Sequence, residues 1–180
     1  MVDRRAEAQN RPAYRAMNPN GTVPTIKDGD YTLWESNSII EYLAMKYAPD
    51  LLYGDDLETF ASASRWMGWE GNSFLPHQHT LVMHLVRLPP EDRDPAQVEG
   101  ARQALLRPLQ IIEDQLAQTE FIAGDRFTMG DIPIGIRVHR WFLFDLETPE
   151  LPNLARWYEI IRQRPAFLAH IADPAVHLSG

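Results

Sequence analysis

The chain has 180 residues, a length that fits one large domain or two small ones around a buried core. Its 44% hydrophobic and 23% charged residues are typical of a soluble globular protein, and its net charge of -8 disfavours general nucleic-acid binding because phosphate is repelled. There is no cysteine, which excludes disulfides, thiolate metal ligands and a cysteine nucleophile from this chain. No apolar run is long enough for a membrane span or a signal-peptide core, so we expect a cytoplasmic protein without a membrane partner.

The clearest strand signal lies near the N-terminus. Turn-forming residues at 18–21 precede two short strand-like runs, residues 23–27 and 30–34, which flank Asp28 and Gly29. This pattern predicts an antiparallel hairpin. Because two strands alone are only marginally stable, we expect the hairpin to be the edge of a larger sheet.

The rest of the chain is predicted to be helical. Ser36 is a candidate N-cap for a helix with Ile39, Ile40, Leu43 and Tyr47 at helical spacing, which Pro49 ends. A linker follows at residues 51–56. Further helices are predicted over about 57–86, with a disturbance at Pro76, and over 95–116, 128–144, 153–164 and 166–171. The clearest signal for the beginning of a helix is at Thr128, because Asp131 follows three residues later and the two favour a capping box.

The order of several short motifs resembles that of the cytosolic glutathione S-transferase superfamily, and most closely its bacterial theta-like or beta-like members. Each motif alone is weak evidence for the family, but their order and spacing agree over nearly the whole chain. The pieces are Asn18 to Gly21, Val23-Pro24, Asp28-Gly29, Glu35-Ser36, Trp66 and Trp69, Leu88 to Glu91, Phe121 to Ile132, Leu151 to Leu154, and Arg164 to Phe167.

The resemblance implies an α/β plus all-α fold. Residues 1–50 would form the C-terminal part of a thioredoxin-like glutathione-binding domain, and residues 57–180 the family's helical bundle. The first strand-helix-strand unit would lie before Met1, together with the Ser, Tyr or Cys that activates the thiol. We therefore expect this chain by itself to bind glutathione weakly and to turn over poorly.

The resemblance also implies site residues for glutathione, the co-substrate. Val23 would pair with its cysteinyl backbone before a cis Pro24, Glu35 and Ser36 would hold its γ-glutamyl end, and Gln9 would lie near its glycine carboxylate. The local chemistry agrees, because a carboxylate suits the ammonium of the γ-glutamyl end, while a hydroxyl and free N–H groups at a helix start suit its carboxylate. The simpler interpretation is that Ser36 is only a cap and Glu35 only a first-turn acid.

In the helical domain, Trp66 and Trp69 lie three residues apart and share a helix face. They either pack in the core or line the pocket for a hydrophobic electrophile, and both can hold. We predict no metal site, because His77 and His79 do not share a helix face. The implied function is conjugation of glutathione to electrophiles by a homodimeric detoxification enzyme. The alternatives are a non-catalytic binding or scaffold protein of the same fold, and a glutathione-dependent isomerase, dehalogenase or peroxidase.

Overall fold

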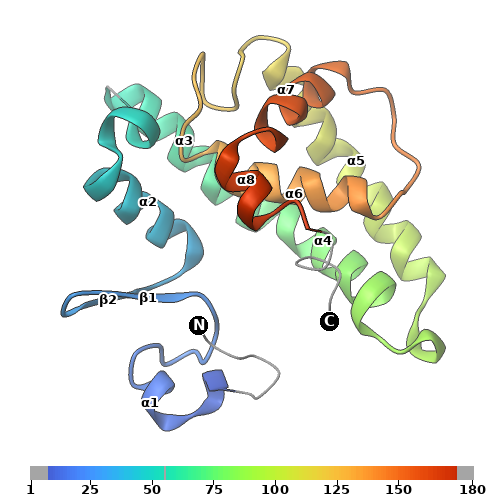
Figure 1. The fold of residues 1–180 in the computed structure, drawn as a ribbon. Coiled ribbons are helices and arrows are strands. Elements are labelled where there is room, and N and C mark those ends of the chain that lie inside the picture. The colour runs from blue at the N-terminus through green and yellow to red at the C-terminus, as the bar shows by residue number, and fades with distance from the viewer. Residues whose placement is uncertain (1–7, 55, 174–180) are drawn as a thin grey trace. The chain divides into compact units, whose positions relative to one another are not determined.

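The computed structural model describes residues 8–54 and 56–173, and the chain divides into two compact units, residues 1–55 and 56–180 (Figure 1). The first unit holds the only sheet within the described residues, and the second is helical. This agrees with the predicted fold class, a hairpin-containing α/β part followed by a helical bundle. No helix in the described ranges combines the length and hydropathy that a bilayer span needs.

The first unit is built around the predicted hairpin. Strands β1 (Thr25–Asp28) and β2 (Tyr31–Trp34) pair antiparallel, with Thr25 opposite Trp34 and Asp28 opposite Tyr31. The two-residue turn between them is therefore residues 29–30, one position later than the predicted Asp28-Gly29. Gly29 takes a φ of 61°, which glycine adopts without the steric cost that a side chain brings.

Short helical elements flank the hairpin. They are a 3₁₀ turn (Ala8–Asn10), the one-turn α1 (Pro12–Arg15), the predicted helix α2 (Ser36–Tyr47), and a π-helical turn (Pro49–Tyr53) that overlaps the predicted linker. Ile39 and Ala44 of α2 are buried. The C-terminal end of α2 is joined to the hairpin through one carboxylate oxygen.

That oxygen is Asp28 Oδ2, at the end of β1. It accepts hydrogen bonds from Lys46 Nζ at 2.7 Å, Tyr47 Oη at 2.7 Å and Tyr42 Oη at 2.8 Å. The hydrogen bond from Lys46, with those from Tyr47 and Tyr42, lowers the pKa of Asp28 to about 2. The carboxylate is thus held ionised, and it ties the strand to the helix that follows it.

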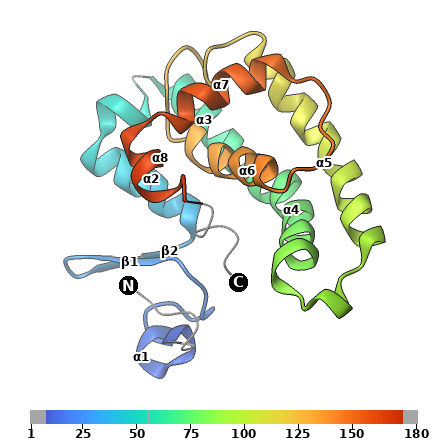
Figure 2. The same cartoon turned by 45° about the vertical axis from the view of Figure 1, so that its right-hand side comes forward.

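The second unit is a bundle in which α6 lies among the other helices (Figures 1 and 2). It packs against α3, α4 and α7, and α5 packs against α4 and α7. The bounds are α3 (Leu57–Trp69), α4 (Leu75–Val82), α5 (Pro95–Leu116), α6 (Asp131–Leu143), α7 (Pro152–Arg162) and α8 (Pro165–His170). The largest fully buried side chains of this core are Trp141, Trp157, Phe74, Met67, Leu81, Leu105, Leu109, Ile112, Leu116, Ile122, Met129 and Ile134.

Helices α3 and α4 follow one another through a π-helical turn (Glu70–Phe74), and a second π-helical turn (Met83–Arg87) ends α4. The helix is thus interrupted from Glu70 on, six residues before the predicted interruption at Pro76. Pro76 itself lies in the first turn of α4, where the missing N–H of proline is tolerated. Buried Glu70 pairs with Arg137 of α6, so the first π-helical turn is tied to the centre of the bundle.

The start of α6 is organised by the buried carboxylate of Asp131. It accepts hydrogen bonds from Thr128 N at 2.8 Å, Ile122 N at 3.0 Å and Trp157 Nε1 at 2.9 Å. Only half of the predicted capping box is formed, because the Thr128 hydroxyl contacts Gly130 N and Asp131 Oδ2 rather than the Asp131 N–H. Asp131 therefore joins the preceding loop, α6 and α7, which is more than a local cap does.

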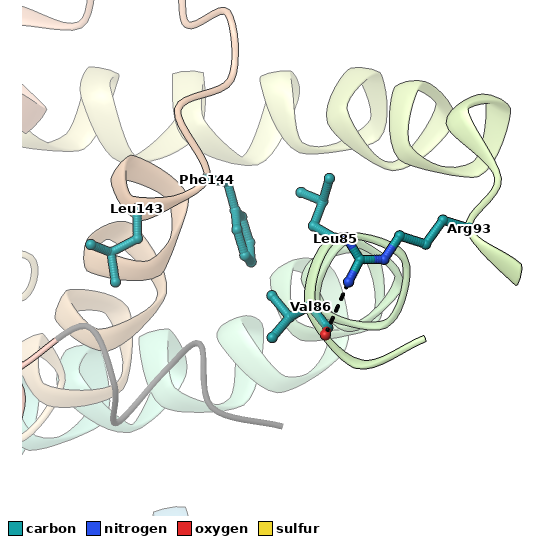
Figure 3. A pocket seen from close by; sticks show the side chains of 5 residues that line it. All are labelled: Leu85, Val86, Arg93, Leu143 and Phe144. Atoms are coloured by element: carbon teal, nitrogen blue, oxygen red, sulfur yellow. Dashed lines mark hydrogen bonds between the residues drawn. The ribbon is translucent and has the colours of Figure 1, made fainter. Parts of the chain in front are cut away.

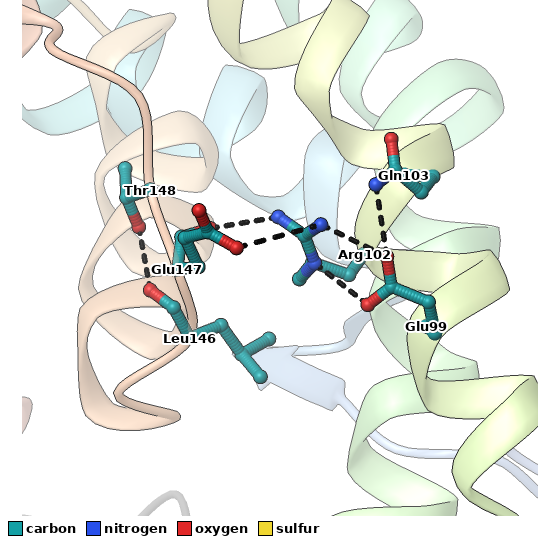
Figure 4. Close-up of polar contacts among 6 residues, drawn as sticks. All are labelled: Glu99, Arg102, Gln103, Leu146, Glu147 and Thr148. Carbon is teal, nitrogen blue, oxygen red and sulfur yellow. Dashed lines mark hydrogen bonds and ion pairs between the residues drawn. The ribbon is translucent and has the colours of Figure 1, made fainter.

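The segment between α6 and α7 is fastened to α5 by Arg102 (Figure 4). Its guanidinium donates two hydrogen bonds of 2.8 Å to Glu99 and one of 3.0 Å to the Glu147 carbonyl. Thr148, one residue on, accepts a hydrogen bond from Trp141 Nε1 and donates one to the Leu146 carbonyl. The segment thus has specific partners although it contains no regular element.

Candidate functional site

Four of the predicted glutathione-site residues meet at the open end of the hairpin. The Val23–Pro24 peptide bond is cis, as predicted. Val23 and Pro24 come directly before Thr25, and Glu35 and Ser36 come directly after its strand partner Trp34, so the two pairs flank the same end of the hairpin. Val23 is half-buried and the other three side chains are exposed. Among the described residues the Val23 backbone N–H and C=O have no hydrogen-bond partner, so both groups remain available to a ligand.

The loop that carries Val23 is held by two side chains that the sequence analysis did not single out as positioning residues. Buried Tyr14 donates a hydrogen bond of 2.6 Å from its hydroxyl to the Thr22 carbonyl, and the same hydroxyl lies 2.8 Å from Thr25 Oγ1. Buried Asn18 donates from Nδ2 to the Thr22 carbonyl at 2.9 Å and to Thr25 Oγ1 at 3.2 Å. Thr22 and Thr25 flank Val23-Pro24, so the cis peptide is fixed from both sides.

Glu35 turns the chain from β2 into α2 with φ 73° and ψ 117°, a sparsely populated conformation for a residue with a side chain. Such a conformation costs about 1–3 kcal/mol and is found most often where a site requires it. Helix α2 begins at Ser36, so Ser36 is its first residue and not its N-cap, which corrects the prediction by one position. Glu35 occupies the N-cap position and its side chain makes no capping bond.

The first residue of α2, Ser36, is therefore open to an anion. The first intrahelical bond described for this end joins Ile39 N to the Glu35 carbonyl at 2.9 Å, and the turn contains no acidic side chain. Within the described residues the Ser36 hydroxyl has no hydrogen-bond partner. Free N–H groups at a helix start attract a carboxylate, and the Glu35 carboxylate next to them attracts an ammonium. Under the simpler interpretation Ser36 would be the cap and Glu35 a first-turn acid, whereas Glu35 holds the N-cap position without a capping bond and Ser36 is the first helical residue.

The structure places Gln9 in the 3₁₀ turn, outside this group. Its side chain is half-buried and its Oε1 atom is buried without a hydrogen-bond partner among the described residues. No hydrogen bond between described residues joins Gln9 to the hairpin. Its predicted place near the glycine end of glutathione therefore rests on the resemblance alone.

Trp66 and Trp69 lie on α3 in the second unit, with ring centroids 5.1 Å apart in an edge-to-face arrangement. Trp66 is 5% exposed and belongs to the core, and both rings also line a cavity of about 370 Å³. Core packing is thus confirmed for Trp66, and the cavity beside the pair is compatible with the second interpretation, which stays a prediction. The Trp66 Nε1–H is buried without a hydrogen-bond partner in the described part of the chain. The other lining residues are Arg65, Ile111, Asp114, Gln115 and Gln118.

Two family models match this chain. Residues 5–50 match the N-terminal domain of glutathione S-transferases, and residues 74–165 match their C-terminal domain. The chain belongs to the glutathione S-transferase family. Its two compact units correspond to these two matches, and the exposed hairpin end falls within the first of them.

Individual relatives agree with this assignment. Glutathione S-transferase GstB of Escherichia coli K12 is 37% identical over 155 residues, which are 85% of this chain and 74% of that protein. Glutathione S-transferase 3 of Zea mays is 33% identical over 183 residues, with 95% and 80% covered. A theta-class glutathione S-transferase of Xanthomonas axonopodis pv. citri, solved with glutathione bound, has a TM-score of 0.87 at 42% identity, with 92% of this chain and 79% of that one covered.

Proposed function

We propose that this family member is a glutathione S-transferase that binds glutathione at the open end of its hairpin and conjugates it to a small electrophile. Transferase activity with glutathione as co-substrate follows from the relatives, which carry this name at 37–42% identity over most of the chain. The observation that carries the site is the unpaired Val23 backbone at the same end of the hairpin as the uncapped start of α2.

Each residue has a role that suits one part of glutathione. The Val23 N–H and C=O pair with the backbone of the cysteinyl residue as a strand would. The Glu35 carboxylate binds the ammonium of the γ-glutamyl end, and the Ser36 hydroxyl with the first N–H groups of α2 binds its carboxylate. Gln9 is assigned to the glycine end. These contacts bind and orient the peptide and leave its sulfur free to react.

The reaction is a nucleophilic substitution or addition in which the sulfur of glutathione attacks an electrophilic carbon. Glutathione loses its thiol proton to solvent or to a base, and the thiolate forms a C–S bond with the electrophilic carbon. In a substitution the leaving group, such as halide, departs with the bonding electron pair. The Tyr14 hydroxyl is already engaged by the Thr22 carbonyl and Thr25 Oγ1, and we give it a positioning role rather than this activating one.

The electrophile is assigned to the cavity beside Trp66 and Trp69, whose rings offer stacking surface. We further propose that the protein acts as a homodimer in the cytoplasm, where it detoxifies hydrophobic electrophiles. The domain assignment that goes with this proposal is residues 1–50 for glutathione, 51–56 as linker and 57–180 for the electrophile.

The test is glutathione binding by isothermal titration calorimetry to the wild type and to Glu35→Gln. Charge-assisted hydrogen bonds contribute about 1.5–3 kcal/mol, so the variant should bind glutathione about tenfold or more weakly. A glutathione analogue without the γ-glutamyl amino group should bind both proteins equally weakly. Glu58→Gln, which neutralises an exposed first-turn acid of α3, is the matched control and should leave the affinity unchanged.

Conjugation to a reactive aryl halide is measured alongside. Slow conjugation above the buffer rate would agree with the poor turnover expected of this chain, whereas binding with no conjugation above the buffer rate would favour the non-catalytic alternative. Equal affinity of the wild type and Glu35→Gln for glutathione would refute the assignment of Glu35 to the ammonium.

A further inference from the structure

The loop before the hairpin contains the pair Asn20-Gly21, and no other asparagine in the sequence is followed by glycine. Asn20 is exposed, and Gly21 has a φ of 65°, in the region that favours glycine. The backbone nitrogen after an asparagine can attack the carbonyl carbon of its side chain, which makes asparagine a thermolabile residue. Glycine obstructs this attack least because it has no side chain. The sequence thus places a reactive pair directly before Thr22 and Val23.

A β-turn restrains the pair in the structure. Gly21 N donates a hydrogen bond of 3.0 Å to the Asn18 carbonyl, and Asn20 Nδ2 donates one of 3.2 Å to Asn18 Oδ1. Buried Asn18 cannot react in the same way, because Pro19 after it has no N–H. A single hydrogen bond at the surface opens often, so Gly21 N is released in a fraction of the molecules. The turn therefore slows the attack and does not prevent it.

A guanidinium lies against this turn. A Cβ built on Gly21 would lie 3.1 Å from Arg15 Nη2 and 3.2 Å from Arg15 Cζ. Among the described residues Arg15 has no carboxylate partner, and its one side-chain hydrogen bond is the 3.5 Å contact with Asn10 Oδ1. The described chain holds no acid from residue 8 to residue 27, and Glu35 at the same end of the hairpin makes no ion pair with Arg15. A positive charge here stabilises the negative charge that develops on Gly21 N and on the oxygen of the attacked carbonyl.

We propose that Asn20 is a self-modification site, at which Gly21 N displaces ammonia beside Arg15 and leaves aspartate or isoaspartate at position 20. A base removes the Gly21 amide proton, and the nitrogen forms a bond with Asn20 Cγ. The bond between Cγ and Nδ2 then breaks, and ammonia leaves with a proton from solvent. Water opens the resulting cyclic imide at either of its carbonyls. The conversion consumes water, releases ammonia and needs no oxidant or reductant.

The consequence for the binding site rests on the proposed function. In isoaspartate the main chain runs through Cβ and Cγ and is longer by one carbon. The lengthened chain would lie between Asn18 and Thr22, whose carbonyl is held by Asn18 Nδ2 and by the Tyr14 hydroxyl. Because these contacts position Val23, the conversion should displace the Val23 backbone and weaken glutathione binding.

Two other positions serve as internal references. Asp28 also precedes a glycine, but hydrogen bonds from Lys46 and two tyrosines hold its carboxylate ionised, and an ionised carboxylate resists nucleophilic attack. Asn72 is exposed like Asn20, but a serine follows it, and its Nδ2 donates a hydrogen bond of 2.8 Å to a carbonyl one helical turn earlier. Neither position should convert at the rate of Asn20.

The test incubates the full chain in mildly alkaline buffer made with water enriched in heavy oxygen. Mass spectrometry of the peptides locates the label, and fragmentation distinguishes isoaspartate from aspartate. Asn20 should gain most of the label, ahead of Asn72 and Asp28. Arg15→Gln should slow the conversion about fivefold, the effect of a unit charge a few ångströms away in water. Arg11→Gln, which removes an exposed arginine at the start of the same helix, is the matched control and should leave the rate unchanged.

Circular dichroism of both variants establishes that they are folded. Label spread evenly over the asparagines would overturn the site, and equal rates in Arg15→Gln and the wild type would overturn the role of Arg15.

Glutathione binding is measured separately on converted protein purified by anion exchange. It should bind glutathione severalfold more weakly than fresh protein, whereas Asn20→Asp, which carries the charge without the longer chain, should bind nearly as well as the wild type. Equal affinity of converted and fresh protein would refute the link to Val23. Failure of the fresh protein to bind glutathione would refute the proposed function and leave the labelled site standing.

Discussion

Glu113 of α5 caps the first turn of α7 at Leu154, although the two residues are 41 positions apart in the sequence. Its Oε2 accepts a hydrogen bond from Leu154 N at 2.8 Å, and its Oε1 accepts from Asn153 N at 3.1 Å and Asn153 Nδ2 at 2.6 Å. Helix α7 has no cap from its own N-cap residue, Leu151. In return, Arg156 of α7 donates to the Leu116 carbonyl at the end of α5. Each helix thus places a charge that favours the dipole of the other.

Replacing Glu113 by alanine should destabilise the protein by about 1–3 kcal/mol, because the buried N–H groups of α7 lose their acceptor. Urea unfolding followed by circular dichroism measures the effect. Asp114→Ala, at the exposed neighbouring position on α5, is the control and should change the free energy of unfolding by less than about 0.5 kcal/mol. Equal losses in the two variants would show that Glu113 does not cap α7.

Tyr14→Phe should weaken glutathione binding without removing any proposed contact to the ligand. The variant loses the hydroxyl that holds Thr22 and Thr25, so we expect a loss of stability of about 1 kcal/mol and an increase of roughly threefold or more in the Kd for glutathione. Tyr47→Phe loses one hydroxyl contact to Asp28 in the same unit and should leave that Kd unchanged. Equal changes in Kd would mean that the hydroxyl of Tyr14 has no special role in placing Val23.

The buried carboxyl of Asp131 should make stability depend on pH. Burial raises its pKa from 3.8 to about 6, against the opposing effect of its hydrogen bonds. The folded state therefore binds more protons than the unfolded state between these values, so the stability that this group contributes is fully present below about pH 4 and is lost as pH rises to about 6. The expected slope is about 1.4 kcal/mol per pH unit.

Asp131→Asn cannot titrate at this position and serves as the reference. Subtracting its free energy of unfolding from that of the wild type, pH by pH, removes the contribution of the other acids. The difference should fall between pH 4 and 6 and be flat above that range. Parallel curves over the whole interval would contradict the raised pKa.

Gly130→Ala and Gly100→Ala should have opposite effects on stability. A Cβ on Gly130 would lie 3.0 Å from the Ala63 Cα and 3.1 Å from the Ala63 carbonyl oxygen, so α3 and α6 would have to move apart, at a cost of about 1–3 kcal/mol. Gly100 lies within α5 with no atom within 4 Å of the same position, and alanine should stabilise the helix by up to about 1 kcal/mol. Thermal unfolding of both variants measures the two changes in stability. A Gly130→Ala protein as stable as the wild type would show that α3 and α6 can move apart at this contact without cost.

Elements that depend on residues close together in the sequence could be predicted from the sequence. The hairpin followed from two strand-like runs around Gly29, and α2 from apolar residues between Ser36 and Pro49. Long-range pairing could not be predicted in this way, because nothing near Leu154 indicates that its N–H is met by Glu113. The π-helical turn at Glu70 could not be predicted for a related reason. It holds one residue more than an α-helical turn, and this extra residue depends on tertiary packing and not on the neighbouring residues in the sequence.

The same distinction between local and long-range contacts applies to the candidate site. The resemblance identifies Val23-Pro24 and Glu35-Ser36, and the pairing of Thr25 with Trp34 sets these two pairs at the same end of the hairpin. The support behind them could not be predicted, because Asn18 among other turn formers gives no sign that its side chain will be buried against Thr22.

The two π-helical turns between α3 and the loop before α5 also determine in which direction the side chains of this segment point around the helix axis. Each turn acts as one residue inserted into an α-helix, so it rotates everything that follows by about 100° relative to an uninterrupted helix. Leu85 comes 19 residues after Trp66, so the first turn removes an offset of about 100° and brings Leu85 back to the side of the path that carries Trp66. One continuous backbone path lines a cavity beside Trp66 together with α5, and another beside Leu85 together with the end of α6 (Figure 3).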